Sequence, residues 1–312
     1  MKFVFVMNRL ETVDPDSDTG ILFIEESLRR GHETFWLSHD ELSLRGNIPF
    51  GLVRQIHIDK KNKEWWRFGE CELVKLDSFN AIFMRHDPPF DEKYLTATYI
   101  LDFLSEKTFI MNRPKGIRAA NEKIYALNFP QFSPATIITS SEKEILSFVD
   151  EHKGKAIIKP IYLMRGLGIH LLRDDDPNLS SIIETVTDYG KQHVIVQEYL
   201  KEGAQGDKRI LLLNGRPIGT MTRIPRPGQI RANLRYGSTC VKTTLTDKDM
   251  SICDAIAPSL IRDGLYFVGL DVIGGYLTEV NVTSPTGTVL INRLQNVQLE
   301  KMVIDFVESK AS

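Results

Sequence analysis

The first 37 residues alternate between strand and helix in an order that favours a parallel sheet. Residues 2–7 and 33–37 are apolar, β-prone runs. Between them, Asp18 or Thr19 can cap a helix that Gly31 ends. Two strands joined through a helix need a crossover connection, which parallel strands use. The sequence therefore predicts an α/β fold that begins with a parallel-sheet domain.

A further buried strand is predicted at residues 81–84, followed by the loop 85–90. Two consecutive prolines in that loop end the strand. Arg85 and Asp87 therefore lie just past its carboxyl end, where open α/β sheets collect ligands.

Other apolar runs predict more strands and a closing helix, and the first unit ends near residue 121. The predicted strands are 109–112, 156–160, 194–200, 209–213, 216–221, 268–273 and 276–281. Asn214-Gly215 predicts a tight hairpin turn between two of them. Helices are predicted at Glu122-Lys123 and at 298–308.

Composition excludes several classes of protein. The 312 residues carry 39 Lys and Arg against 41 Asp and Glu, so a net charge of −2 argues against nucleic-acid binding. No apolar run approaches the length of a membrane span. The cysteines Cys71, Cys240 and Cys253 show no metal-binding spacing, which predicts a reducing, cytoplasmic environment.

Asp271, Glu279 and Asn281 form the strongest candidate site. Their oxygen atoms are the donors that Mg²⁺ selects. Glu279 and Asn281 share one face of a strand. A two-residue loop at Gly274-Gly275 aims Asp271 at the opposite face, whereas a three-residue loop that adds Tyr276 pairs Asp271 with Glu279. The metal site therefore requires the odd loop, and the alternative is a hairpin with solvated polar residues.

Four cations complete the pattern of candidate residues. Lys159 lies near the end of a strand and either projects from the sheet or extends along the surface. Arg209 and Arg223 flank the Asn-Gly hairpin, where a solvated face is the alternative. Together with Lys123 and a metal site, these side chains suit a polyphosphate and a carboxylate.

Five motifs, in order, resemble those of prokaryotic glutathione synthetases, which are ATP-grasp ligases, and the resemblance covers nearly the whole chain. The motifs occupy residues 84–90, 121–123, 207–209, 267–273 and 277–286. The resemblance implies an N-terminal α/β (pre-ATP-grasp) substrate domain at 1–121, an ATP-grasp lid at 122–196 and a catalytic subdomain at 197–312. It also implies a homo-oligomer, a dimer or tetramer, without nucleic-acid or membrane partners.

The resemblance assigns site residues in four groups. ATP as co-substrate is implied to contact Lys123, Lys159, Arg165, Gly166, Gln197, Glu198, Tyr199, Leu200 and Asp207. The catalytic pair is Arg209 and Arg223. The substrate residues are Arg85, Asp87, Asn233, Asn281, Ser284 and Thr286. Two Mg²⁺ ions, with Mn²⁺ as a possible substitute, are implied at Asp271, Glu279 and Asn281.

The chain departs from the family in two loops and after Thr286, where residues 287–291 lack the acidic side chains usual in the family. Residues 162–168 and 234–237 carry bulky side chains where the family has glycine-rich segments. In the first loop Arg165 adds a cation, and we expect it to contact the γ-phosphate or an acyl phosphate. The alternative is an arginine that points to solvent on a mobile lid. The resemblance implies ligation of γ-glutamylcysteine to glycine with release of ADP and phosphate. The alternatives are a paralogous ligase for another acid or amine and a catalytically weak nucleotide-binding regulator.

Overall fold

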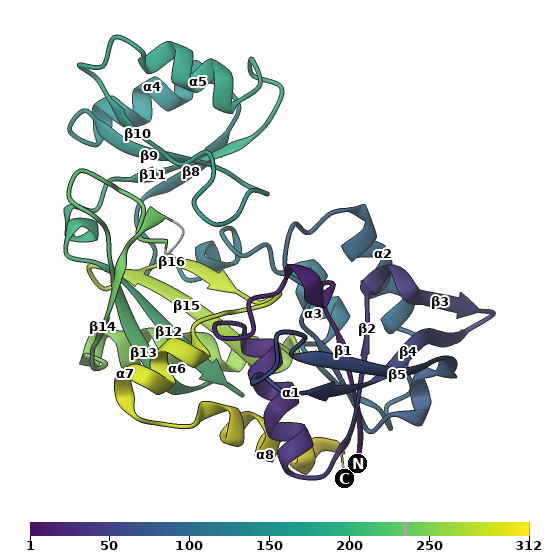
Figure 1. Ribbon diagram of the computed structural model, residues 1–312. Coiled ribbons are helices and arrows are strands. Elements are labelled where there is room, and N and C mark those ends of the chain that lie inside the picture. Colours follow the sequence, from purple (N-terminus) through teal and green to yellow (C-terminus); the bar gives the residue numbers. More distant parts are fainter. Residues whose placement is uncertain (234–235, 312) are drawn as a thin grey trace.

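The computed structural model describes residues 1–233 and 236–311, which form three sheets around one deep pocket. Both chain ends lie together at the bottom of an N-terminal α/β unit (Figure 1). A four-stranded sheet stands apart at the top, and a five-stranded sheet lies beside the N-terminal unit (Figure 1). The predicted mixed α/β class is confirmed.

The N-terminal sheet has the order β3-β4-β2-β1-β6-β7, with β5 paired to β4. Its strands are β1 (Lys2–Val6), β2 (Glu33–Leu37), β3 (Leu42–Arg45), β4 (Ile48–Ile58), β5 (Trp66–Lys75), β6 (Ala81–Met84) and β7 (Phe109–Met111). Its helices are α1 (Thr19–Arg29), α2 (Glu92–Leu101) and α3 (Pro114–Ala119). As predicted, β1 runs parallel to β2 and also to β6, so the loop after Met84 leaves the carboxyl edge of the sheet.

Capping explains where α1 begins. The Asp18 side chain accepts a hydrogen bond from the Ile21 amide at 2.8 Å, which satisfies a free amide of the first turn. Ile21, Phe23 and Ile24 are fully buried beneath the sheet. The predicted cap and the stop at Gly31 are confirmed, and Gly31 adopts φ +82°.

The second sheet is antiparallel with the order β10-β9-β11-β8. It contains β8 (Thr136–Thr139), β9 (Lys155–Pro160), β10 (His170–Arg173) and β11 (Val194–Glu198), and it packs against α4 (Glu142–Glu151) and α5 (Leu179–Val186). This unit has its own small core. We refer to it as the lid.

The third sheet has the order β14-β13-β12-β15-β16, so β16 lies at its edge. Its strands are β12 (Asp207–Leu213), β13 (Arg216–Ile224), β14 (Thr239–Lys242), β15 (Phe267–Ile273) and β16 (Tyr276–Asn281), and α6 (Asp247–Arg262), α7 (Thr288–Gln295) and α8 (Leu299–Ala311) accompany them. The predicted Asn214-Gly215 turn is confirmed, with φ of +50° and +76°.

The last helix joins this sheet to the N-terminal unit. Arg30, which follows α1, donates to Asp305 at 2.6 Å and to Glu308 at 2.9 Å on α8. Buried side chains of α1 and α8 belong to one hydrophobic core. The chain ends therefore meet in a shared packed interface.

Several predicted elements differ from the structure. Strand β13 continues to Ile224 instead of residue 221, and α8 continues to Ala311 instead of residue 308. Residues 121–124 form a turn instead of a helix, because the Asn121 side chain accepts from the Lys123 and Ile124 amides at 3.2 Å each. The strand predicted to reach Leu200 ends at Glu198. Short 3₁₀ segments occur at Leu10–Thr12, His39–Glu41, Leu76–Ser78, Tyr125–Asn128 and Lys201–Ala204.

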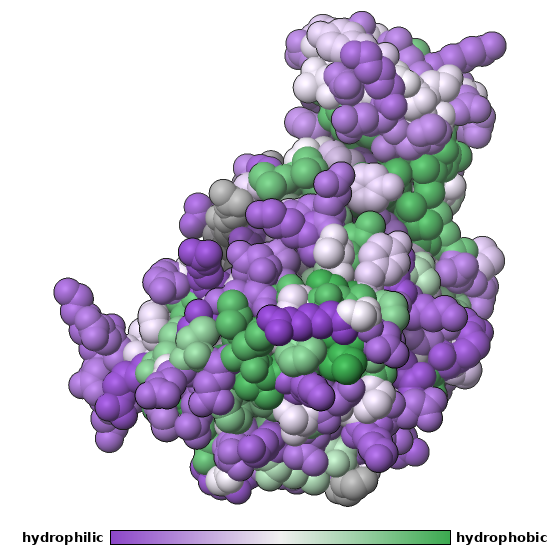
Figure 2. Space-filling model, turned by 90° about the vertical axis from the view of Figure 1, so that its right-hand side faces the viewer, coloured by the Kyte–Doolittle hydropathy of each residue, from purple (hydrophilic) through white to green (hydrophobic). Residues whose placement is uncertain are grey.

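The side that carries β3, β4, β5 and α2 shows apolar areas between polar ones (Figure 2). Exposed apolar side chains on and next to these elements are Leu44, Leu52, Leu73, Tyr99 and Phe103. Among the described residues, the helices are too short or too polar to cross a bilayer.

Candidate active site

One cavity of about 280 Å³ lies between the lid, the third sheet and the loops of the N-terminal unit. It collects all but one of the residues that the sequence nominated. Those lining it are Asp87, Lys123, Lys159, Arg165, Gly166, Gln197, Glu198, Tyr199, Leu200, Asp207, Arg209, Arg223, Asn233, Asp271, Glu279, Asn281, Ser284 and Thr286. Asp87 and Thr286, which are 199 positions apart in the chain, therefore meet in one site.

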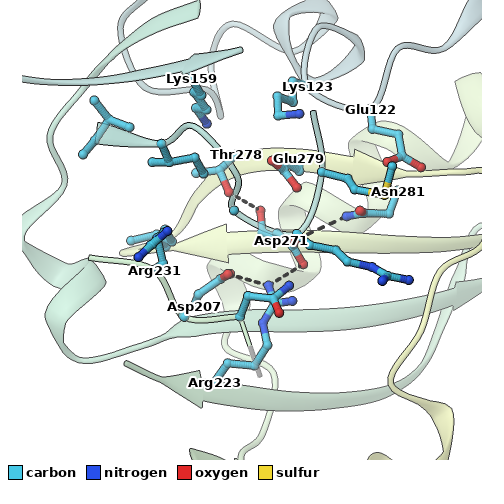
Figure 3. Close-up of a pocket in the computed structure, with 18 of the residues that line it drawn as sticks. Glu122, Lys123, Lys159, Asp207, Arg223, Arg231, Asp271, Thr278, Glu279 and Asn281 are labelled. Carbon is cyan, nitrogen blue, oxygen red and sulfur yellow. Dashed lines mark hydrogen bonds and ion pairs between the residues drawn. The ribbon is translucent and has the colours of Figure 1, made fainter. Parts of the chain in front are cut away.

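A buried charge network forms the floor of the pocket (Figure 3). Arg209 donates to both carboxylate oxygens of Asp271, at 2.6 and 3.0 Å. Arg223 contacts Asp271 at 3.0 Å and also pairs with Asp207. Burial opposes ionisation of Asp271, but the two guanidinium groups outweigh it and hold its pKa below the usual range. Burial raises the pKa of Asp207.

The β15–β16 hairpin corrects the predicted loop. The turn is the two-residue loop Gly274-Gly275, with Ile273 opposite Tyr276. Asp271 nevertheless pairs with Glu279, because a bulge shifts the register between Asp271 and Val272. Thr278 stabilises the bulge by donating from its hydroxyl to the Asp271 carbonyl at 3.0 Å. The three-residue loop was therefore wrong, but an extra residue, Thr278, enters the strand two positions after Tyr276.

Glu279 and Asn281 provide oxygen donors next to Asp271 (Figure 3). In the described part of the chain, the Glu279 carboxylate has no hydrogen-bond or ion-pair partner. The Asn281 amide nitrogen donates to Asp271 at 3.2 Å, which leaves its oxygen available. No three His, Cys, Asp or Glu side chains of the described residues cluster as a metal site. The donor set is therefore two carboxylates and one amide, which fits a hard cation such as Mg²⁺.

Two lysines face this group from the other side (Figure 3). Lys159 is only 6% exposed although it lies on β9, so the alternative of a surface lysine is excluded. Burial lowers its pKa, against the opposing influence of Glu279. Lys123 donates to the Ile161 carbonyl at 3.3 Å and to that of Leu163. The site therefore holds two cations above two carboxylates.

Arg85 is the nominated residue that does not line the pocket. It is 4% exposed and donates to the Pro285 carbonyl at 3.0 Å. Ser284 donates back to the Arg85 carbonyl at 3.3 Å. Arg85 therefore holds the loop after β16 through two hydrogen bonds, without lining the pocket itself.

Arg165 reaches across the mouth of the pocket. Its guanidinium donates to Asp87 at 2.8 Å and joins the lid to the N-terminal unit. Arg165 and Gly166 have φ of +57° and +76°. A side chain on Gly166 would approach the Tyr236 ring at 3.2 Å, so this turn packs closely against the facing loop. Residues 234 and 235 of that loop lie outside the described residues.

Sequence reasoning missed several pocket residues. Glu122 accepts hydrogen bonds from the amides of Val282 and Thr283, and loss of solvent raises its pKa. Arg231 stacks on Tyr236, with its guanidinium carbon 3.7 Å from the ring centre. The position of Glu122 next to Lys123 in the sequence could have indicated Glu122. No local pattern indicated Arg231.

Comparisons with known proteins agree along the whole chain. The family model "prokaryotic glutathione synthetase, N-terminal domain" matches residues 1–118, and "prokaryotic glutathione synthetase, ATP-grasp domain" matches 122–296. Glutathione synthetase of Gloeobacter violaceus is 43% identical over 98% of this chain and 96% of that protein. Glutathione synthetase of Synechococcus elongatus is 41% identical over 99% and 98%.

A solved structure has the same fold. The ATP-grasp ligase PsnB, complexed with minimal precursor, Mg and ADP, superimposes with a TM-score of 0.64 at 14% identity. The match covers 99% of this chain and 98% of PsnB. The predicted ATP-grasp architecture is confirmed.

Proposed function

The chain belongs to the prokaryotic glutathione synthetase family of ATP-grasp ligases, and from this premise we propose that it joins γ-glutamylcysteine to glycine. The ATP-dependent ligase class is established by the family. The observation that supports the proposed site is the convergence of Lys123 and Lys159 with Glu279 and Asn281 in one cavity. The domain division at 121/122 and 196/197 is also a proposal, although its second boundary falls within lid strand β11 (Val194–Glu198).

The reaction needs activation, because a carboxylate is a poor electrophile. The carboxylate oxygen attacks the γ-phosphorus of ATP and forms an acyl phosphate while ADP leaves. The amine then attacks the acyl carbon, phosphate departs with the C–O electron pair, and the amine loses a proton. Positioning and charge neutralisation supply most of the rate enhancement in such phosphoryl transfer.

The chain's cations neutralise the phosphates in this proposal. Lys123 and Lys159 contact the phosphate groups, and Arg165 with Gly166 approaches the γ-phosphate. The segment Gln197–Leu200 meets the adenine, and Asp207 lies near the ribose. Arg209 and Arg223, fixed by Asp271 and Asp207, hold the reacting carboxylate and the transferring phosphoryl group.

Asp271, Glu279 and Asn281 would hold divalent metal, for which we propose two Mg²⁺ ions, with Mn²⁺ as a substitute. Divalent metal supplies charge neutralisation at the phosphates when bound. Asp271 also contacts two arginines, so its carboxylate links the metal ligands to the groups that hold the substrate.

The peptide substrate contacts Asp87, Asn233, Asn281, Ser284 and Thr286 in this proposal. Arg85 also belongs to the proposed substrate residues, and its hydrogen bonds with Pro285 and Ser284 favour a role through the 284–286 loop.

A substrate panel tests the function. Purified protein with ATP and Mg²⁺ is given γ-glutamylcysteine and either glycine, alanine, serine or β-alanine, and ADP and product mass are measured. We expect ADP release matched by one equivalent of the tripeptide with glycine. ADP release only with another acid or amine would indicate a paralogous ligase, and nucleotide binding without product would indicate a regulator.

We also propose a cytoplasmic homo-oligomer, a dimer or tetramer. Cys71, Cys240 and Cys253 are all free thiols, as suits a reducing compartment. The exposed apolar side chains Leu44, Leu52 and Leu73, on β3, β4 and β5, suit contact with a second copy of the chain. Light scattering after size-exclusion chromatography tests this, and a monomer at micromolar concentration would contradict it.

A further inference from the structure

Glu122 lies at the boundary between the N-terminal unit and the pocket, at the edge of β16. Among the described strands, none pairs with the outer edge of β16. Its outward amides nevertheless have acceptors. The Leu277 amide donates to the Phe132 carbonyl at 2.8 Å, and the Val280 amide donates to the Glu122 carbonyl at 2.8 Å. The segment from Glu122 onward therefore covers the edge that carries the candidate metal ligands.

The Glu122 side chain continues this pairing after the backbone turns away. Its Oε1 accepts from the Val282 amide at 2.9 Å, the Thr283 amide at 3.1 Å and the Thr283 hydroxyl at 2.8 Å. Val280 and Val282 are fully buried, so their amides would cost free energy if left without an acceptor. Glu122 thus accepts hydrogen bonds from the outward-facing amides of Val280 and Val282, on both sides of Asn281. Its backbone carbonyl serves the first amide and its side chain serves the second.

The turn away from β16 brings the next residue to the pocket. The amide of Lys123 is held by Asn121, and its amine reaches the lid at Ile161. Glu122 is therefore the covalent neighbour of a phosphate-facing lysine and the hydrogen-bond partner of the strand that carries Glu279 and Asn281. Figure 3 shows Glu122 beside Asn281, on the same side of the pocket as Lys123.

We propose that Glu122 is a positioning residue that fixes the Glu279–Asn281 segment relative to Lys123, so that metal-nucleotide binding depends on it although it is not a ligand. The inference rests on the roles proposed above for Lys123, Glu279 and Asn281. Residues that orient metal ligands typically change metal affinity or activity by about 10- to 100-fold when substituted. An acceptor at this position is required, whereas the negative charge is secondary.

Binding of Mn²⁺ in the presence of ADP, measured by electron paramagnetic resonance of free Mn²⁺, tests the proposal without turnover. We expect Glu122→Ala to weaken Mn²⁺ binding by about 10-fold or more. Glu122→Gln keeps an amide oxygen for the three donors, so we expect it to stay within about threefold of the parent. Binding of adenosine, which has no phosphates, should be unchanged in both variants.

Thr283→Val supplies a second route if Glu122→Ala does not fold. It removes one donor to Glu122 and keeps both amides, so a loss of about two- to fivefold is expected. In the Glu122→Gln background, which keeps the acceptor, Thr283→Val should cause the same loss. Unchanged Mn²⁺ binding in Thr283→Val would overturn the proposal.

Other outcomes separate the proposal from its premise. If Glu279→Gln weakens Mn²⁺ binding but Glu122→Ala does not, the positioning role is wrong and the metal site stands. If Glu122→Gln is as weak as Glu122→Ala while adenosine still binds, the charge acts directly and the positioning role is also wrong. If Glu279→Gln has no effect, the proposed metal site itself fails.

Discussion

Asp271 shows why the chemistry of a single residue depends on its neighbours. Without Arg209 and Arg223 a carboxylate only 4% exposed would be costly to ionise. With both arginines present, its pKa lies below the usual range and it stays charged at neutral pH. Its neighbour Glu279 has no such partner among the described residues, so its charge is free for a cation from outside the chain.

Glu279→Gln therefore tests the metal site at residue level. We expect ADP formation to fall by about 10²- to 10⁴-fold, because an anionic ligand is lost where charge must be neutralised in the transition state. A coupled ADP assay measures this, and an unchanged thermal unfolding midpoint shows an intact fold. Glu142→Gln, at an exposed position on α4, is the matched control. Near-normal turnover would mean that the residues form only a polar hairpin.

His86 predicts a pH dependence of stability. Burial lowers its pKa to about 4, and the His39 ring lies 3.8 Å away, centre to centre. The unfolded chain binds this proton near pH 6.5 whereas the folded chain does not, so stability is full above pH 6.5 and falls as the pH drops toward 4. At pH 5 the loss from His86 amounts to about 2 kcal/mol.

Urea unfolding at pH 7 and pH 5 measures this loss. His86→Asn should lose less stability than the parent between the two values, whereas His57→Asn, at an exposed position on β4, should behave like the parent. If the parent and His86→Asn lose the same unfolding free energy between pH 7 and pH 5, the His86 imidazole does not cause the loss of stability at acidic pH.

At the scale of elements, the sequence predicted periodic and capped segments well. The strands at 2–6, 33–37 and 81–84 and the helix capped by Asp18 follow from local pattern and turn chemistry. It could not predict the bulge at β16, because alternation fixes a face only when the register is known. The long hairpin of β4 and β5 was missed altogether. The helix predicted at Glu122 failed because tertiary pairing with β16 overrides local preference.

The carboxylate of Glu26 in helix α1 leads us to expect a second loss of stability at more acidic pH. Glu26 accepts from Arg29 at 2.6 Å and from Arg30 at 2.7 Å, and these arginines lower its pKa to about 2. This stabilisation is present above pH 4.5 and is lost as the pH falls toward 2. Glu26→Gln should lower the unfolding free energy by about 2 kcal/mol at pH 7, because hydrogen bonds to charged groups are lost.

Urea unfolding of the neighbouring variant Glu25→Gln provides the control. Glu25 pairs with Lys60 at 2.7 Å at the surface, so its loss should cost below about 1 kcal/mol. The difference between the Glu26 variant and the parent should shrink below pH 4. A Glu26 variant as stable as the parent at pH 7 would exclude this network as a link between α1 and α8.

At the scale of the whole molecule, the pocket exists only because three sheets meet. No local pattern brings Asp87, Lys159 and Asn281 together. The chemistry of the side chains suggested a shared site for Lys159 and Asn281, and the family resemblance added Asp87. The lid touches the N-terminal unit through the pair of Asp87 and Arg165, at 2.8 Å. With the Arg165 side chain 54% exposed, such a pair contributes about 0–1 kcal/mol, so it can open at little cost.

Arg165 can therefore exchange Asp87 for a phosphate when nucleotide binds. We expect Arg165→Ala to lower kcat by about 10-fold and to leave the Kd for ATP within about threefold, because the phosphate contact strengthens as the reaction proceeds. Arg165→Lys, which keeps the charge, should recover part of the rate. Steady-state kinetics and ATP titrations measure both.

The same substitution in an Asp87→Asn background should still lower kcat, since the phosphate contact does not need Asp87. If the loss vanishes in that background, the ion pair carries the effect. If kcat is unchanged in Arg165→Ala, the remaining glycines of the loop suffice.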